Sequence, residues 1–182
     1  MLRNVLCILT LLFLLGCGAK KKRTYSKSRT PTITVESSAE EAAPPKISRK
    51  EERKNTKAQN IIATAMTFSG TRYKYGGTTQ KGMDCSGLVF VSLKENDIEF
   101  PRVSHQMAEH GKRIKVGQVQ KGDLLYFKTG KSGKRINHVG LVVDVNRNEI
   151  KFIHATTSRG VIVSSLREGY WNHAFVKAMR IL

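Results

Sequence analysis

Two kinds of apolar pattern follow each other along residues 57–182, and their order limits the fold of this chain more than any other feature. Residues 58–68 carry apolar side chains at the spacing of a helix, and this pattern stops before Gly70. Beyond Gly111, short apolar runs between turn-forming residues predict strands at 123–128, 138–145, 149–155, 161–164 and 174–182. Helices followed by strands predict an α+β domain in which an antiparallel sheet packs on the helices.

Two segments between these regions are less regular. Residues 88–93 are apolar at every position but Ser92, which fits a buried helix that begins near Cys85, but their β-branched side chains also allow a strand. Residues 104–110 predict a short helix that ends at Gly111.

The chain begins with a segment typical of secretion. Arg3 precedes an apolar run from Val5 to Leu15, which is too short to cross a bilayer as a helix. The next residues, Gly16-Cys17, resemble a bacterial lipobox, which implies a signal peptide at 1–16 and acyl chains on Cys17 that hold the protein at a membrane. Gly18 then implies an outer-membrane anchor that faces the periplasm. The alternative is an ordinary signal segment, in which Cys17 has no role.

The composition changes after the cysteine. Residues 17–56 are rich in Lys, Arg, Ser, Thr, Glu and Pro, which predicts a disordered tether and leaves one domain at 57–182. The basic cluster at 20–23 either binds anionic lipid head groups or is a solvated part of the tether, and we favour the solvated tether.

The charge balance raises the question of nucleic acid. The chain carries a formal net charge of +18, and a basic surface can indicate nucleic-acid binding. The basic residues are scattered, however, and the secretion signal directs the protein out of the cytoplasm. We therefore expect a polyanionic component of the cell envelope as its surroundings, and no nucleic-acid partner.

The three cysteines have different fates in this interpretation. Cys7 leaves with the signal peptide and Cys17 is acylated, so Cys85 is the only free thiol and has no partner for a disulfide. An unpaired thiol in an oxidising compartment suggests that the thiol has a function.

The residues around Cys85 favour a nucleophile. Asp84-Cys85-Ser86-Gly87 begins the apolar run, and the amino end of a helix together with an imidazole would lower the pKa of the thiol. The first backbone N–H groups of such a helix would also stabilise an oxyanion beside the sulfur. The alternative is a buried, inert cysteine.

Two histidines are candidates for the partner of this thiol. His138 begins one predicted strand and His154 lies near the end of the next. A three-residue loop with Asn148 in the left-handed conformation would set His154 opposite Gly140 and bring both histidines to one face of the sheet. A two-residue loop would turn them to opposite faces unless the hairpin contains a bulge. We therefore predict an odd-length loop or a bulge.

A cysteine with two histidines allows two chemistries. One is nucleophilic catalysis, and the other is a zinc site with three protein ligands. The sequence has no HExxH or CxxC spacing, so we expect no metal. We expect structural or surface roles for His105, His110 and His173.

From Gly70 to Trp171 these residues resemble the NlpC-type peptidases of peptidoglycan. In chain order, the motifs that carry the resemblance are Tyr73 with Gly76-Gly77, Asp84-Cys85-Ser86-Gly87, Pro101-Arg102, Gly122-Asp123-Leu124, His138-Val139-Gly140 and Phe152-Ile153-His154-Ala155.

The resemblance implies a papain-like fold and hydrolysis of amide bonds in the stem or crosslink peptides of the wall. It implies no cofactor and no metal, and we expect a monomer. It implies the following roles: Cys85 as nucleophile, His138 as general base, His154 as the residue that orients the base, Tyr73 beside the oxyanion site, and Asp84 and Ser86 as substrate-binding residues.

The best likeness is to lipoprotein members that cut the D,D-crosslink between stem peptides, while many relatives cut after D-glutamate. An amide or acyl transferase with the same site, or a module that binds wall peptides without cutting them, remains an alternative.

Overall fold

The computed structural model describes residues 48–130 and 135–182. The predicted signal peptide at 1–16, the acylated Cys17 and the tether as far as residue 47 lie outside the described residues. In the part of the chain that the structure does describe, no helix is both long and apolar enough to cross a membrane.

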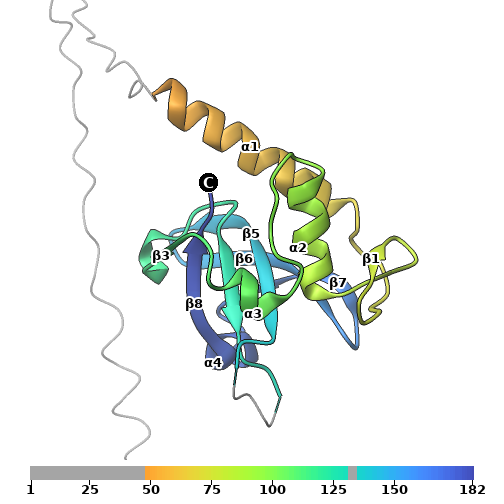
Figure 1. The fold of residues 1–182 in the computed structure, drawn as a ribbon. Helices are drawn as coiled ribbons and strands as arrows, with labels where there is room; N and C mark the ends of the chain where they lie inside the picture. The colour runs from red at the N-terminus through yellow and green to blue at the C-terminus, as the bar shows by residue number, and fades with distance from the viewer. Residues whose placement is uncertain (1–47, 131–134) are drawn as a thin grey trace, which may run out of the picture. The chain divides into compact units, whose positions relative to one another are not determined.

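The predicted α+β class and antiparallel sheet are confirmed (Figure 1). The larger sheet has six strands in the order β3-β8-β4-β5-β6-β7. The strands are β1 Thr78–Thr79, β2 Gly82–Met83, β3 Lys112–Ile114, β4 Leu124–Phe127, β5 His138–Asn146, β6 Glu149–Thr156, β7 Gly160–Ser165 and β8 Phe175–Arg180. The helices are α1 Arg49–Met66, α2 Cys85–Lys94, α3 Ser104–Met107 and α4 Gly169–Ala174, with a 3-10 turn at Val116–Gln118. Strands β4 to β8 match the five predicted strands, whereas α4 and the short strands β1, β2 and β3 were not predicted.

Helix α1 begins earlier than the sequence predicts. The expected helix covers 58–68, but α1 starts at Arg49, so the prediction of a disordered tether is wrong for residues 49–56. Ser48 caps the helix and exchanges hydrogen bonds with Glu51 in a capping box, which supplies partners for the first backbone N–H groups. Residues 49–57 are exposed, and this part of the helix extends away from the sheet (Figure 1). Without a buried face the segment has no apolar periodicity.

The apolar run after Cys85 is helical, so the alternative of a strand is wrong. Asp84 is the N-cap of α2, and its side chain accepts a hydrogen bond from the backbone N–H of Gly87. The next five residues, 85–89, are all buried, which explains why the sequence shows no amphipathic pattern there. The short helix α3 is confirmed, but it ends at Met107 rather than at His110.

Both faces of the sheet are covered. Leu124 and Tyr126 of β4 pack in a core with α1 and α2, whereas Leu125 and Phe127 pack in a second core with Trp171 of α4. All four residues of β4 are therefore buried, and the strand reads as a continuous apolar run instead of an alternating one.

The hairpin between β5 and β6 contains a bulge, which is the second of the two arrangements that the sequence predicts. Asn146 pairs with Glu149, so the loop has two residues, and the predicted three-residue loop with a left-handed Asn148 is wrong. The register shifts between Val142 and Asp144, which adds one residue to β5. This extra residue returns the two histidines to the same face of the sheet.

Candidate active site

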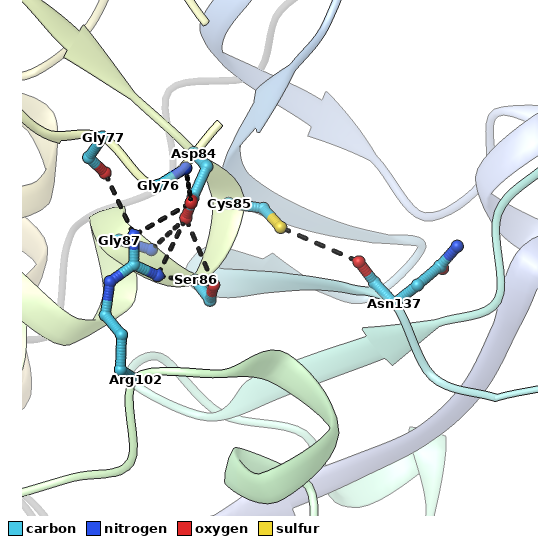
Figure 2. A network of polar contacts seen from close by, with 8 residues as sticks. All are labelled: Gly76, Gly77, Asp84, Cys85, Ser86, Gly87, Arg102 and Asn137. Carbon is cyan, nitrogen blue, oxygen red and sulfur yellow. Dashed lines mark hydrogen bonds and ion pairs between the residues drawn. The ribbon is translucent and has the colours of Figure 1, made fainter. Parts of the chain in front are cut away.

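Cys85 is the first residue of α2 and lies against the beginning of β5. Its Sγ is 4.0 Å from the carbonyl oxygen of Asn137 (Figure 2), and the backbone N–H of Val139 lowers the pKa of the thiol. These two residues flank His138 in the chain. The backbone N–H groups of Ser86 and Cys85 lower the pKa of the thiol as well. The thiol therefore lies between the amino end of a helix and the first residues of a central strand.

The predicted pair of histidines is present on neighbouring strands. His138 Nε2 is 2.9 Å from His154 Nδ1, and the two rings are nearly perpendicular at 89°. One of these two nitrogens must donate a proton to the other, so their lone pairs cannot both point at one metal ion. Among residues 48–130 and 135–182, no group of three potential ligands could hold a metal.

Burial makes both imidazoles neutral. It lowers the pKa of His138 to about 4. It also lowers the pKa of His154 to about 2, with smaller contributions from the charges of His138 and Arg159. His154 is 0% exposed, and its Nε2 has no hydrogen-bond partner among the described residues. A proton added to this pair would have little solvation, which is the reason for both shifts.

The thiol is neutral as well, contrary to the sequence-based expectation of a lowered pKa. Burial raises the pKa of Cys85 to about 11, and the charge of Asp84 raises it further, while the backbone N–H groups lower it. The backbone N–H groups at the amino end of α2 thus lower the pKa of the thiol by less than burial raises it. The site thus contains a neutral thiol and two neutral imidazoles.

Asp84 and Ser86, two predicted substrate-binding residues, are engaged within the protein (Figure 2). Asp84 Oδ1 accepts from the Gly87 N–H at 2.6 Å, from Arg102 at 3.0 Å and from Ser86 Oγ at 3.2 Å. Asp84 Oδ2 accepts from the Gly76 N–H at 2.7 Å and from Arg102 at 2.9 Å. Because a carboxylate offers about four lone-pair sites, the structure does not support direct contact of Asp84 with a substrate.

The Asp84 carboxylate is ionised. Burial raises its pKa, but the hydrogen bonds from Arg102 and Gly87 outweigh burial and hold the pKa below its usual value. Arg102 also donates to Ser86 Oγ at 2.8 Å. The sequence identified Arg102 only as part of a motif, and its place directly after Pro101 gave no indication of its partner.

Tyr73 packs against the core that contains Cys85. It is held by a bridge to Met83, the last residue of β2. Burial raises the pKa of the tyrosine hydroxyl, and the neighbouring Cys85 and Asp84 raise it further. The hydroxyl is therefore neutral and able to donate a hydrogen bond.

Trp171 packs against both histidines and was not predicted to do so. Its ring stacks on His138 at 5.1 Å and 22°, and meets His154 edge to face at 4.4 Å and 82°. Phe127 contacts the tryptophan from the sheet at 5.3 Å. The only signal in the sequence was that Trp171 is the single tryptophan of the chain.

These residues can carry out nucleophilic acyl transfer. The site combines a buried thiol at the start of a helix with backbone N–H groups that lower its pKa. The thiol contacts Asn137, the neighbour of His138 in the chain, and the neutral imidazole of His138 is hydrogen-bonded to that of His154. This set of groups on an α+β fold defines a cysteine-type peptidase.

Comparison with known families gives the same class. Residues 70–180 match the NlpC/P60 family. The chain belongs to the NlpC/P60 family.

Two relatives align over nearly the whole chain. It is 32% identical over 182 residues to "murein DD-endopeptidase MepS/murein LD-carboxypeptidase" of Escherichia coli, covering 100% of this chain and 93% of the relative. It is 36% identical to "probable endopeptidase NlpC" of the same organism, covering 99% of this chain and 100% of the relative. A gamma-DL-glutamyl hydrolase of Bacillus subtilis is 32% identical, but covers 70% of this chain and only 30% of the relative's length.

Solved structures share the fold. An NlpC/P60 family protein from Bacillus cereus superposes with a TM-score of 0.62 at 28% identity, over 69% of this chain and 40% of that one. The NlpC/p60 domain of the peptidoglycan hydrolase SagA superposes with a TM-score of 0.56 at 27% identity, over 68% of this chain and 98% of that one.

Proposed function

We propose that this protein hydrolyses amide bonds in the peptides of peptidoglycan, with Cys85 as the nucleophile. The observation that carries the proposal is the position of the Cys85 thiol at the start of α2, against the residues that flank His138. The named activities of the full-length relatives, one on murein and one a probable endopeptidase, agree with this substrate.

The proposed mechanism starts from neutral groups. His138 takes the proton of the Cys85 thiol as the sulfur adds to the scissile carbonyl, so that the ion pair exists only during the reaction. The N–H groups of Cys85 and Ser86 at the amino end of α2, which lower the pKa of the thiol, hold the developing oxyanion with the Tyr73 hydroxyl. His138 then protonates the leaving amine, and water releases the acyl group from the sulfur.

His154 orients the base. In the tautomer that serves catalysis, His138 donates its Nε2–H to His154 Nδ1 and keeps a lone pair on Nδ1 for the thiol proton. Because His154 is neutral, it stabilises the imidazolium less than a carboxylate would. We expect His138→Ala to abolish peptide release and His154→Ala to reduce it without abolishing it. Equal and complete loss in both variants would count against these roles.

The bond that we propose is the D,D-crosslink between stem peptides, because the murein DD-endopeptidase relative aligns over the full chain whereas the gamma-DL-glutamyl hydrolase aligns over part of it. The experiment is digestion of purified peptidoglycan with the wild type and with Cys85→Ala, followed by mass spectrometry of the released peptides. Separated, uncrosslinked stem peptides support the proposal. Peptides cut after D-glutamate would transfer the assignment to that bond, and an absence of any Cys85-dependent product would exclude the peptidase.

The same digestion distinguishes hydrolysis from transfer. Added amine acceptors leave the products of a hydrolase unchanged, whereas a transferase would join the acceptor to the new carboxyl end. Wall binding by the wild type without any cleavage would indicate the non-cleaving module.

We also propose that the mature protein is a monomer held by acyl chains on Cys17 at the outer membrane, facing the periplasm. The acylation and the address rest on residues 1–18 alone. The mass of the amino-terminal peptide tests the acylation. Recovery of Cys17→Ala from the soluble fraction, where the wild type sediments with outer membranes, tests the address.

A further inference from the structure

Next to the Cys85 thiol lies an ion pair that the proposed reaction does not use. Arg102, in the segment between α2 and α3, binds Asp84 through two guanidinium nitrogens, at 3.0 Å and 2.9 Å. Asp84 is the N-cap of α2 and directly precedes the cysteine. A fixed negative charge beside a thiolate is unfavourable, and the Asp84 charge does raise the pKa of Cys85. The charge of the Asp84 N-cap therefore disfavours the thiolate form of Cys85.

Arg102 also joins two segments that form the site (Figure 2). Its guanidinium donates to the Gly77 carbonyl oxygen at 3.3 Å, besides Ser86 Oγ and Asp84. The Gly76 N–H in turn donates to Asp84, and the Asp84 N–H donates to Gly77. Tyr73 is at the start of this loop, and Cys85 raises the pKa of its hydroxyl. A Cβ at Gly87 would overlap the Gly77 carbonyl oxygen, so the loop rests directly on the first turn of α2.

We propose that Arg102 is a positioning residue that acts on Cys85 through Asp84. It fixes the loop of Tyr73 on the amino end of α2, and it offsets the charge that the N-cap places beside the sulfur. Burial gives this charge a larger effect, because Asp84 has only 8% of its side chain exposed and Arg102 has 30%. The inference rests on the proposed role of Cys85 as nucleophile.

Other ionisable groups around the thiol come from each element that packs on it. They are Tyr73 from the preceding loop and the hydrogen-bonded pair of His138 from β5 and His154 from β6. Both histidines are neutral, since burial lowers the pKa of each, and the tyrosine is neutral as well. Among the described residues around the thiol, Asp84 and Arg102 are thus the charged groups in the resting site.

The test measures the alkylation rate of Cys85 against pH, in the full chain, on the proteolytic peptide that contains Cys85. Arg102→Gln leaves the Asp84 charge without its partner, so we expect the profile to move up by about one pH unit, a tenfold slower reaction at pH 8. Asp84→Asn in the same chain removes the remaining charge and keeps an N-cap residue. The double variant should react at least as fast as the wild type, because the Asp84 charge raises the pKa of Cys85 even with Arg102 present. An Arg102→Gln profile that overlays the wild type, or a double variant that stays shifted, would overturn the proposal.

The ion pair between Arg180 and Asp123, which directly precedes β4, provides a matched control. Arg180 pairs with Asp123 at 2.8 Å with side-chain exposures of 29% and 3%, so Arg180→Gln breaks an ion pair of the same kind. It should leave the alkylation profile unchanged while its effect on the melting temperature resembles that of Arg102→Gln. A shift in Arg180→Gln equal to that in Arg102→Gln would show a general effect of stability and would also overturn the proposal.

A second variant separates position from charge. Arg102→Lys keeps the cation but loses the planar fork that reaches Asp84, Ser86 and Gly77 together. We expect its alkylation profile to stay near that of the wild type while peptide release falls about tenfold. Wild-type release by Arg102→Lys would contradict the positioning role. The alkylation results do not depend on cleavage, so a failure of the proposed peptidase activity remains distinguishable from a failure of this inference.

Discussion

The buried thiol leads to a prediction about the chemistry of the resting site. With the pKa of Cys85 raised to about 11, about one chain in ten thousand carries the thiolate at pH 7, compared with a few per cent for an ordinary cysteine with a pKa of about 8.5. Alkylation by iodoacetamide should therefore be about two orders of magnitude slower at pH 7 than in the unfolded chain. The rate should rise tenfold with each pH unit from 7 to 10.

The assay follows the Cys85 peptide by mass spectrometry after timed exposure at each pH. The same peptide from chain unfolded in urea is the control, and its rate should level off above its ordinary pKa. The slope is more informative than the absolute rate, since burial also restricts access of the reagent. A rate that is flat between pH 5 and pH 8 would mean that a thiolate–imidazolium pair exists before substrate binds, and would refute the argument from burial.

Three further predictions concern the groups around the site. The pKa of His138 is lowered to about 4 and that of His154 to about 2, so below pH 6.5 the unfolded chain takes up both protons first. Unfolding in urea should therefore require about 4 kcal/mol less at pH 5 than at pH 7, about 2 kcal/mol from each imidazole. The loss should be smaller in His138→Asn, and equal stability at both pH values would contradict the shifts. Trp171→Leu should lower kcat about tenfold by freeing both imidazoles, with Trp171→Phe less affected; an unchanged kcat in Trp171→Leu would exclude a positioning role. A Cβ at Gly140 would overlap the Phe152 ring, so Gly140→Ala should lower the free energy of unfolding by about 1–3 kcal/mol, measured by thermal unfolding. In the control Gly117→Ala the new Cβ meets no atom within 4 Å, and the loss should be much smaller.

The sequence predicted the fold well where periodicity reports burial. Strands β4 to β8 appear as apolar runs between turn residues, the core half of α1 has a helical period, and the motif before α2 located the thiol. The amino-terminal half of α1 was missed because its residues are exposed, and only the capping box of Ser48 and Glu51 marks its start. Helix α4 was missed because its six residues are too few to show a period.

The site shows a similar division. The sequence could restrict the β5–β6 hairpin to two arrangements, but a bulge has no sequence signature, so the choice between bulge and longer loop needed the register. The contacts of Arg102 with Asp84, and of Trp171 with His138, join segments distant in the chain. The raised pKa of Cys85 depends on burial by all of these elements together, which local helix geometry does not report.

The central claim is that the thiol of Cys85 is the nucleophile. The most direct measurement compares peptide release from purified peptidoglycan with the fraction of Cys85 alkylated, in samples of the wild type treated for increasing times. The account predicts that activity falls in proportion to alkylation of Cys85 and reaches zero when every chain is modified at that residue. Activity that survives complete alkylation of Cys85 would contradict it.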